Sequence, residues 1–344
     1  MGVYSHSAIM QAMNFKVCFG FSAKRKVSCI LLLIFLSGCI GAVPEGPQES
    51  PSINEISSSE GDTVSEGSDS ESVIQDLSYA DVSQSQKLDL YLPPGKGPFP
   101  LVLIIHGGGF ISGDKANPNE VERAQLLVQN GFAAASVNYR LSDEAIYPAQ
   151  IQDVKTAVRF LRAKAEAYSI DVSGFGAWGS SAGGTLAALL GTTCGVQELE
   201  GGQLGHAGQS SCIQAVVDWF GLVDLLLMDA QLIEAGCEPI ADDPESNESK
   251  LLGAPVQSVP ELAAMTNPIN YIDAGDAAFF IQHGAEDCRV PPEQSRQLAD
   301  ALRQTLGEEK VEFMMLESVG HGGGEFKTDA NYAMVLDFLD THLQ

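Results

Sequence analysis

Most of what can be inferred from this sequence depends on one pentapeptide, Gly179-Ser180-Ser181-Ala182-Gly183. The residues before it, 174–178, are small or apolar, and the residues after it, 182–190, are rich in alanine and leucine. A strand that turns sharply into a helix with a serine at the corner is the setting of a nucleophile elbow. Glycines two positions before and after that serine let strand and helix approach without a Cβ clash. The pattern also fits a simple glycine-rich turn, so the partners of Ser181 must decide between the two.

A serine hydroxyl becomes a nucleophile when a base takes its proton and a carboxylate orients that base. The predicted base is His321, which follows the last predicted strand on a glycine-rich loop. The predicted acid is Asp287, which follows the preceding strand, with its neighbour Glu286 as the alternative. His283, at the end of that strand, is interpreted as structural. The chain order serine, aspartate, histidine is the order found in α/β-hydrolases.

A glycine run, His106-Gly107-Gly108-Gly109-Phe110, follows an apolar stretch that is predicted to be a buried strand. Attack on an ester carbonyl creates an oxyanion, which backbone N–H groups can stabilise. The sequence therefore predicts an oxyanion hole made by the amides of Gly108, Gly109 and Ala182. His106 is interpreted as structural. A phosphate-binding loop is excluded because no Gly-Lys-Ser/Thr follows the glycines.

Apolar runs and helical stripes alternate along the rest of the chain, which predicts an α/β fold with a mostly parallel sheet and helices on both faces. The strand at 87–91 alternates in hydropathy, so one of its faces is expected to be exposed. The predicted strands are 74–77, 87–91, 99–105, 131–137, 174–178, 215–219, 278–282 and 311–316, and the predicted helices are 120–130, 149–168, 182–190, 293–306 and 331–342.

Two segments interrupt this alternation, residues 192–211 (the first insertion) and 229–261 (the second insertion). Both are rich in glycine, proline or acidic residues. Ligands bind at the carboxyl edge of open α/β sheets, and both insertions are predicted to lie over that edge.

Four cysteines lie in the predicted folded part: Cys194, Cys212, Cys237 and Cys288. In an exported protein, four cysteines indicate two disulfides. Closeness in the chain and position in loops favour the pairs Cys194–Cys212 and Cys237–Cys288. The alternative is four free, buried thiols.

The N-terminal region has the features of an export signal. A basic patch at 24–26 precedes an apolar run at 27–36, which is too short to span a bilayer. The following Leu36-Ser37-Gly38-Cys39 resembles the lipobox of bacterial lipoproteins, in which the cysteine is lipidated. We expect a signal peptide at 1–38 and a lipid anchor on Cys39, which would place the protein in the bacterial cell envelope. An ordinary signal cleaved nearby is the alternative.

Residues 39–72 are predicted to be a disordered tether, because eight acids and no base lie between Glu45 and Glu71. The remaining residues, 73–344, are predicted to form one catalytic domain. The whole chain has 344 residues and a formal charge of −26. Without the four bases of residues 1–38, 15 bases face 45 acids, a charge of −30. Such a chain repels nucleic acid and anionic lipid headgroups, so we exclude nucleic-acid partners.

Taken together, these motifs resemble those of α/β-hydrolase carboxylesterases, in particular the BD-FAE-like (feruloyl and acetyl esterase) and hormone-sensitive-lipase-like groups. The resemblance spans about residues 79–343. It rests on the segments 87–93, 106–110, 113–115, 138–141, 147–153, 178–184 and 320–321, and on His283-Gly284 with Asp287, Val290-Pro291 and Gln294-Ser295.

The resemblance implies an α/β-hydrolase fold, a serine esterase mechanism and no cofactor. It implies a small ester or an acylated saccharide as substrate, with short acyl, acetyl or feruloyl groups. The chain departs from the family's pattern in its cysteine-bearing insertions. Two alternatives are a serine peptidase of the prolyl-oligopeptidase type and a catalytically silent surface lipoprotein that binds a ligand.

Overall fold

The computed structural model describes residues 70–344; the predicted signal peptide, Cys39 and nearly all of the predicted tether lie outside the described residues. The described residues contain an eight-stranded sheet with the order β1-β2-β4-β3-β5-β6-β7-β8. β1 and β2 pair antiparallel with their neighbours, and the strands from β4 to β8 are parallel. The strands are β1 (Ser72–Ser78), β2 (Lys87–Leu92), β3 (Phe99–Ile105), β4 (Ala133–Val137), β5 (Ile170–Ser180), β6 (Ala215–Trp219), β7 (Ala278–Gly284) and β8 (Val311–Leu316).

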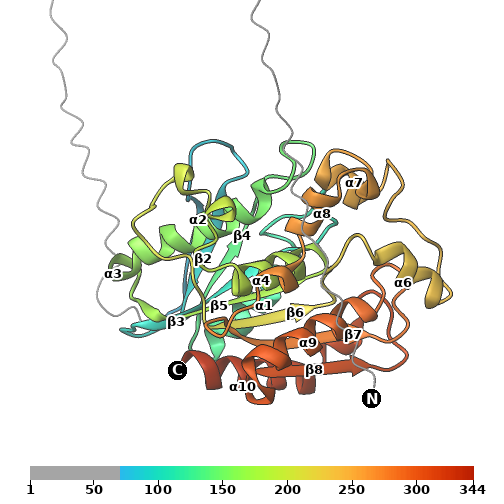
Figure 1. Cartoon of the computed structure of the whole chain (residues 1–344). Helices are drawn as coiled ribbons and strands as arrows, with labels where there is room; N and C mark the ends of the chain where they lie inside the picture. The colour runs from blue at the N-terminus through green and yellow to red at the C-terminus, as the bar shows by residue number, and fades with distance from the viewer. Residues whose placement is uncertain (1–69) are drawn as a thin grey trace, which may run out of the picture. The chain divides into compact units, whose positions relative to one another are not determined.

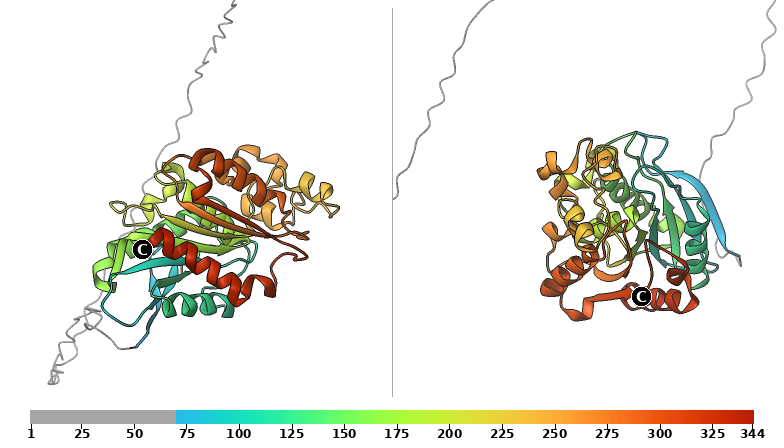
Figure 2. Two further views of the ribbon diagram at one scale, coloured as in Figure 1. Left: turned by 90° about the horizontal axis from the view of Figure 1, so that it is seen from below. Right: turned by 90° about the vertical axis from the view of Figure 1, so that its right-hand side faces the viewer.

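Helices cover both faces of this sheet (Figures 1 and 2). The helices α1 and α10 pack on one face, and α2, α4 and α9 lie on the other. The α-helices are α1 (Pro118–Gln129), α2 (Ala149–Ala163), α3 (Ala165–Tyr168), α4 (Ala182–Thr192), α5 (Gln197–Glu200), α6 (Met228–Glu234), α7 (Asn247–Leu252), α8 (Pro260–Met265), α9 (Glu293–Leu306) and α10 (Asp329–Leu343). Short 3-10 turns are η1 (Gly202–Leu204), η2 (Val256–Ser258), η3 (Pro268–Tyr271), η4 (Glu308–Lys310) and η5 (Gly324–Lys327). None of the helices within 70–344 has the length and apolarity to cross a membrane.

The predicted strands and main helices are all present, with three differences. β1 begins at Ser72, inside the predicted tether. The predicted helix 149–168 is divided, because α2 ends at Ala163 and a short helix, α3, follows Lys164. The prediction that β2 has an exposed face is wrong: α1 lies near that face, and Asp89 is 1% exposed. Asp89 can be buried there because Lys115 Nζ lies 2.7 Å from its Oδ1.

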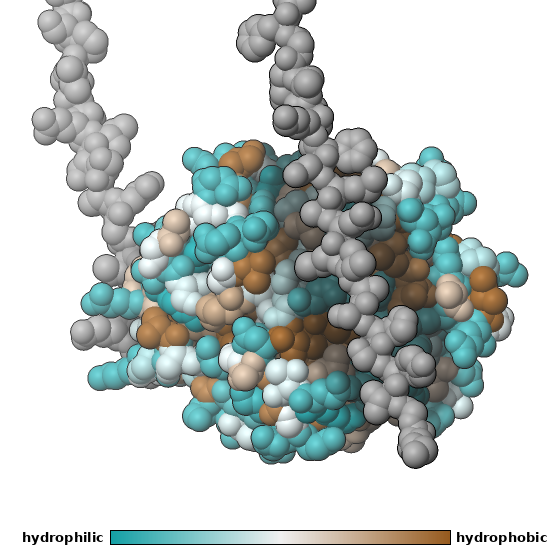
Figure 3. Space-filling view, in the orientation of Figure 1, coloured by the Kyte–Doolittle hydropathy of each residue, from teal (hydrophilic) through white to brown (hydrophobic). Residues whose placement is uncertain are grey.

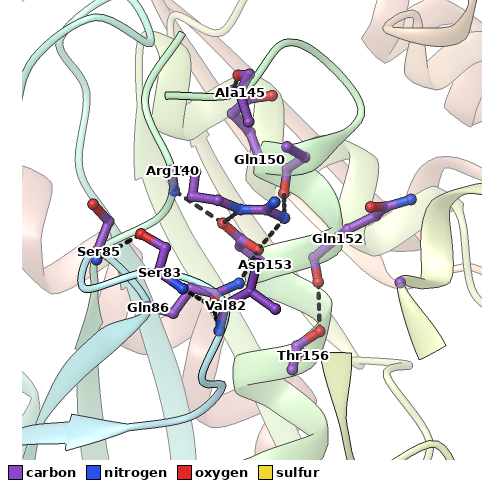
Figure 4. Close-up of polar contacts among 12 residues, drawn as sticks. Val82, Ser83, Ser85, Gln86, Arg140, Ala145, Gln150, Gln152, Asp153 and Thr156 are labelled. Atoms are coloured by element: carbon purple, nitrogen blue, oxygen red, sulfur yellow. Dashed lines mark hydrogen bonds and ion pairs between the residues drawn. The ribbon is translucent and has the colours of Figure 1, made fainter. Parts of the chain in front are cut away.

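One buried carboxylate connects α2 to the first part of the sheet (Figure 4). Both oxygens of Asp153 accept hydrogen bonds from Arg140, at 2.7 to 2.9 Å, and Oδ1 also accepts one from Gln86 Nε2 at 2.7 Å. Asp153 is fully buried, so these donors compensate for its lost hydration. The segments 138–141 and 147–153, which carry part of the family resemblance, therefore meet in one structural cluster, and neither segment lines the cleft that contains Ser181.

The prediction that the first insertion lies over the carboxyl edge of the sheet is wrong. α4 begins at the carboxyl end of β5 and runs back along the sheet, so the residues after Thr192 begin at the amino edge and lead into the start of β6. There α5 and η1 pack against α2. Glu200 accepts hydrogen bonds from Lys155 Nζ at 2.7 Å and from Arg159 Nη1 at 3.1 Å, and both cations are almost completely buried.

The second insertion follows β6 and lies at the carboxyl edge, as predicted. It contains α6, α7, η2 and the start of α8. Both predicted disulfides, Cys194–Cys212 and Cys237–Cys288, are present, with Cα–Cα distances of 4.9 and 5.5 Å. The second of them joins this insertion to the loop after β7.

The surface of the described residues is partly hydrophilic and partly apolar. On the face shown in Figure 3, hydrophilic residues predominate along the periphery, and apolar residues form separate patches.

Candidate active site

Ser181 occupies the corner between β5 and α4, with φ 56° and ψ −123°. This left-handed conformation is costly for a residue with a side chain, so the surroundings must hold it. The Ser181 amide donates to the Trp219 carbonyl at 2.8 Å. A Cβ on Gly179 would lie 2.0 Å from the Gly183 carbonyl oxygen, and one on Gly183 would lie 2.1 Å from that of Ile105. Only glycine therefore fits at positions 179 and 183, two residues before and two residues after this serine.

The structure brings together the three side chains that the sequence nominated. His321 Nε2 lies 2.9 Å from Ser181 Oγ. On the other side of the ring, His321 Nδ1 lies 2.7 Å from Asp287 Oδ2. Since Asp287 can only accept while it is ionised, Nδ1 carries the proton, and Nε2 of the neutral ring is free to accept one from Ser181. The ring of Phe220 packs edge-on against His321, with centroids 4.8 Å apart.

Asp287 is held from both sides and is 1% exposed. Its Oδ1 accepts hydrogen bonds from the amides of Arg289 and Val290 at 2.8 and 2.9 Å. Burial by itself would raise the pKa of Asp287, but hydrogen bonds from His283 and His321, with the charge on His321, outweigh it and keep this pKa below its ordinary value. The carboxylate therefore stays ionised throughout the neutral range.

The other candidates are placed elsewhere. Glu286, the alternative acid, is exposed and contributes its backbone amide to the Val319 carbonyl at 2.8 Å. His106 stacks on Tyr139 with ring centroids 4.4 Å apart, and its Nδ1 lies 2.7 Å from the Gly107 carbonyl, so it supports the glycine loop.

The glycine loop lies beside Ser181, where a Cβ on Gly107 would be 3.5 Å from the serine Cβ. Gly108 and Gly109 have φ of +115° and +61°, values that glycine adopts at little cost. Within residues 70–344, neither of their amides donates a hydrogen bond to another group of the loop or of its neighbours. Together with the amide of Ala182 at the first turn of α4, they are available to a ligand.

Gly108, Gly109, Ser181 and His321 border a cleft of about 970 Å³. Three of the residues that line this cleft, Phe220, Asn247 and Arg289, were not predicted from the sequence. Phe220 comes directly after β6, which was a usable signal because strand ends form this edge. Asn247 comes from the second insertion, and no periodic pattern indicated its approach to Gly109, where a Cβ would lie 2.0 Å from Asn247 Nδ2.

Arg289 is held in the cleft wall by a carboxylate of the second insertion. Its Nη2 donates to Glu248 Oε1 at 3.0 Å. The Glu248 side chain is 1% exposed, whereas that of Arg289 is 33% exposed, so the guanidinium extends from a buried anchor into the cleft. Burial raises the pKa of Glu248, and the nearby Arg289 only partly offsets this rise.

Comparison with known proteins identifies the group of sequences to which these features belong. Residues 88–302 match the sequence profile of the family described as BD-FAE. A solved structure described as a truncated form of a carbohydrate esterase from gut microbiota is 33% identical, has a TM-score of 0.71, and shares 78% of this chain and 95% of its own. A bifunctional GH43-CE protein from Bacteroides eggerthii is 35% identical with a TM-score of 0.70, and the match covers 78% of this chain and 38% of that one.

Among curated proteins, esterase LipC of Mycobacterium tuberculosis is 28% identical over 225 residues, which are 65% of this chain and 53% of LipC. The chain spans about half the length of the curated relatives that it matches. The similarity therefore covers the domain that contains the cleft.

Proposed function

This chain belongs to the BD-FAE family and has the α/β-hydrolase fold, and from that premise we propose that it is a serine carboxylesterase that removes short acyl groups from carbohydrates. The observation that carries this proposal is the hydrogen-bonded series Ser181–His321–Asp287 beside a loop of free amides.

The proposed reaction has two halves. His321 Nε2 takes the proton of Ser181 Oγ while Oγ bonds to the ester carbonyl carbon, and the negative charge moves to the carbonyl oxygen. The amides of Gly108, Gly109 and Ala182 stabilise that oxyanion. The C–O bond to the alcohol then breaks, and His321 returns the proton to the leaving alkoxide. Water attacks the acyl-enzyme by the same route, and the acid is released with Ser181 regenerated.

The lining of the cleft supports a hydroxyl-rich alcohol. Beside the catalytic groups it presents side chains that donate and accept hydrogen bonds, namely Ser112, Asp114, Asn117, Asn119, Asn247 and Arg289. Sugar hydroxyls need partners of both kinds, whereas a long acyl chain needs an apolar wall. One similar structure is described as a carbohydrate esterase, which agrees with this substrate class. Acetyl and feruloyl groups are the acyl groups that we propose.

Replacement of the nucleophile tests the mechanism. Ser181→Ala should lower kcat for p-nitrophenyl acetate by roughly 10⁶-fold, the loss seen when the serine of another serine hydrolase is removed. A fluorophosphonate probe should label the native protein and leave this variant unlabelled, while circular dichroism confirms that both are folded. Substantial turnover by the variant would contradict the mechanism. A native protein that neither turns over esters nor reacts with the probe would favour the ligand-binding alternative.

The substrate class is tested by the profile of kcat/KM over acyl length and alcohol. We expect the highest values for acetylated or feruloylated oligosaccharides and a steep fall beyond short acyl chains. Higher values for long-chain glycerol esters would overturn the carbohydrate proposal while leaving the serine mechanism intact. Cleavage of prolyl peptides in place of esters would favour the peptidase alternative.

We also propose that the protein is exported and anchored by a lipid on Cys39, for which the basic patch, apolar run and lipobox-like residues are the support. Metabolic labelling with a radioactive fatty acid should mark the native protein and not Cys39→Ser. Equal labelling of the two, or none of either, would contradict the anchor.

A further inference from the structure

A second histidine, His283 near the end of β7, reaches the same carboxylate as His321. Its side chain is fully buried. His283 Nε2 lies 3.3 Å from Asp287 Oδ2 and 2.9 Å from the Val290 carbonyl oxygen. On the other side of the ring, Nδ1 lies 2.7 Å from Ser295 Oγ on α9. Two pairs of serine and histidine, Ser181–His321 and Ser295–His283, therefore meet at Asp287.

The partners of His283 determine where its proton lies. Nε2 faces a carbonyl and a carboxylate, both of which only accept hydrogen bonds, so Nε2 must carry hydrogen. In the neutral ring Nδ1 is then an acceptor, and the hydroxyl of Ser295 is the donor that faces it. A further ionisable group near this ring is Asp218 on β6, which is also fully buried. Ser295 thus donates to Nδ1 and stabilises the tautomer of His283 that the two acceptors at Nε2 require.

We propose that His283 and Ser295 are positioning residues for the proposed esterase reaction: Ser295 stabilises the Nε2–H tautomer of His283, and His283 holds Asp287 Oδ2 toward His321. This inference rests on the proposed serine mechanism. Neither residue touches the substrate or the reacting atoms, because Asp287 and His321 stand between them and Ser181.

The assignment follows from how the donors are divided between the two oxygens of Asp287. Oδ1 accepts hydrogen bonds from the backbone amides of Arg289 and Val290. Oδ2, the oxygen that faces His321, has His283 Nε2 at 3.3 Å as its second donor, whose hydrogen is shared with the Val290 carbonyl at 2.9 Å. Without His283, Oδ2 would have one donor left within the described chain, and the carboxylate could rotate about its Cβ–Cγ bond away from the line to His321.

Loss of this donor should change both the rate and its pH dependence. A misdirected Asp287 orients the imidazole less well, which lowers kcat. Displacement of Asp287 also changes how strongly this carboxylate stabilises protonated His321, so the acidic limb of kcat/KM should move. A side chain that only filled space would alter neither the position of that limb nor the tautomer of a neighbouring ring.

The test compares His283→Leu, which removes the donor, with His283→Gln, which can place an amide N–H near the same oxygen. The matched control for the His283 variants is His342→Gln on α10. The control for Ser295→Ala is Ser136→Ala, which changes a buried serine whose Oγ donates to the Lys115 carbonyl at 2.7 Å. With p-nitrophenyl acetate, kcat of His283→Leu should be roughly 10- to 100-fold lower, with little change in KM. This range is taken by analogy from residues that hydrogen-bond to the ligands of a metal and orient them. His283→Gln should recover part of the lost kcat, and Ser295→Ala should show a smaller loss in the same direction.

Three results would overturn the proposal. One is a normal kcat and pH profile in folded His283→Leu. Another is equal activity of the Leu and Gln variants with an unmoved acidic limb. The third is a ¹⁵N-histidine NMR spectrum of the native protein in which His283 is the Nδ1–H tautomer. The NMR measurement needs no activity, so it separates failure here from failure of the serine mechanism, which Ser181→Ala and the fluorophosphonate probe report. If His283→Leu does not fold, Ser295→Ala and the NMR spectrum decide.

Discussion

The two insertions are similar in composition, but they are attached to different parts of the molecule. Each carries a disulfide and a glutamate paired with a basic residue of the main domain. The first insertion is attached to α2 through Glu200, at the amino edge of the sheet. The second is attached through Cys288 and Arg289 to the loop that carries Asp287. The same kind of cross-link therefore stabilises the outer part of the domain in one case and the candidate active site in the other.

This comparison predicts that the second disulfide matters for both stability and rate. Cys237 and Cys288 are 51 residues apart, so their loss by the double change to serine should cost about 4 kcal/mol of unfolding free energy in the chain-entropy account. Because Cys288 follows Asp287, kcat should also fall by roughly 10- to 100-fold, as expected for a catalytic group displaced by about 1 Å. Urea unfolding and ester hydrolysis at 25 °C measure the two effects. Unchanged kcat would show that the Asp287 loop keeps its geometry without this link.

The first disulfide should affect stability alone. Cys194 and Cys212 are 18 residues apart, which predicts a loss of about 3 kcal/mol when both are replaced by serine. Because this insertion contributes no residue to the lining of the cleft, kcat and KM of the folded variant should match those of the native protein. A large fall in kcat with native-like unfolding would remove the distinction between the two insertions.

Glu200→Gln should be the next largest change, with a loss of up to about 3 kcal/mol at neutral pH, because it leaves the buried Lys155 and Arg159 without their carboxylate. Although burial opposes ionisation of Glu200, hydrogen bonds from Lys155 and Ser211 lower its pKa below 4.5. Its contribution is therefore fully present above pH 4.5 and is lost as the pH falls through the folded-state pKa. The difference in Tm between native protein and variant should close on acidification. A constant difference would contradict the ionic role.

Glu248→Gln should cause the smallest loss of unfolding free energy, about 1 kcal/mol, because Arg289 remains partly hydrated when its partner is neutral. The pH dependence should have the opposite sign. Burial raises the pKa of Glu248 above 4.5, so the native protein loses stability from this group as the pH rises from 4.5 through the folded-state pKa. The Tm of the native protein, relative to that of the variant, should therefore be highest at acidic pH. The same trend as for Glu200→Gln would show that Arg289, and not burial, dominates at Glu248.

The sequence alone located the strands, the elbow and the three nominated side chains, because each of them depends on local signals: periodicity, glycine spacing and position after a strand. It misplaced the first insertion, since only the direction in which α4 runs shows at which edge the following residues begin. It also did not show that His283 lies 3.3 Å from Asp287, because that distance depends on how the loop after β7 folds back.

By itself, the sequence determined which residues could form the elbow, the base and the acid, since these depend on residue type, spacing and order along the chain. The identity of the cleft walls was decided only by tertiary structure. Asn247, Phe220 and Arg289 come from separate segments, and Glu248 and a disulfide hold the insertion against the catalytic loop. Contacts between distant segments depend on chain direction and packing, which no local pattern encodes.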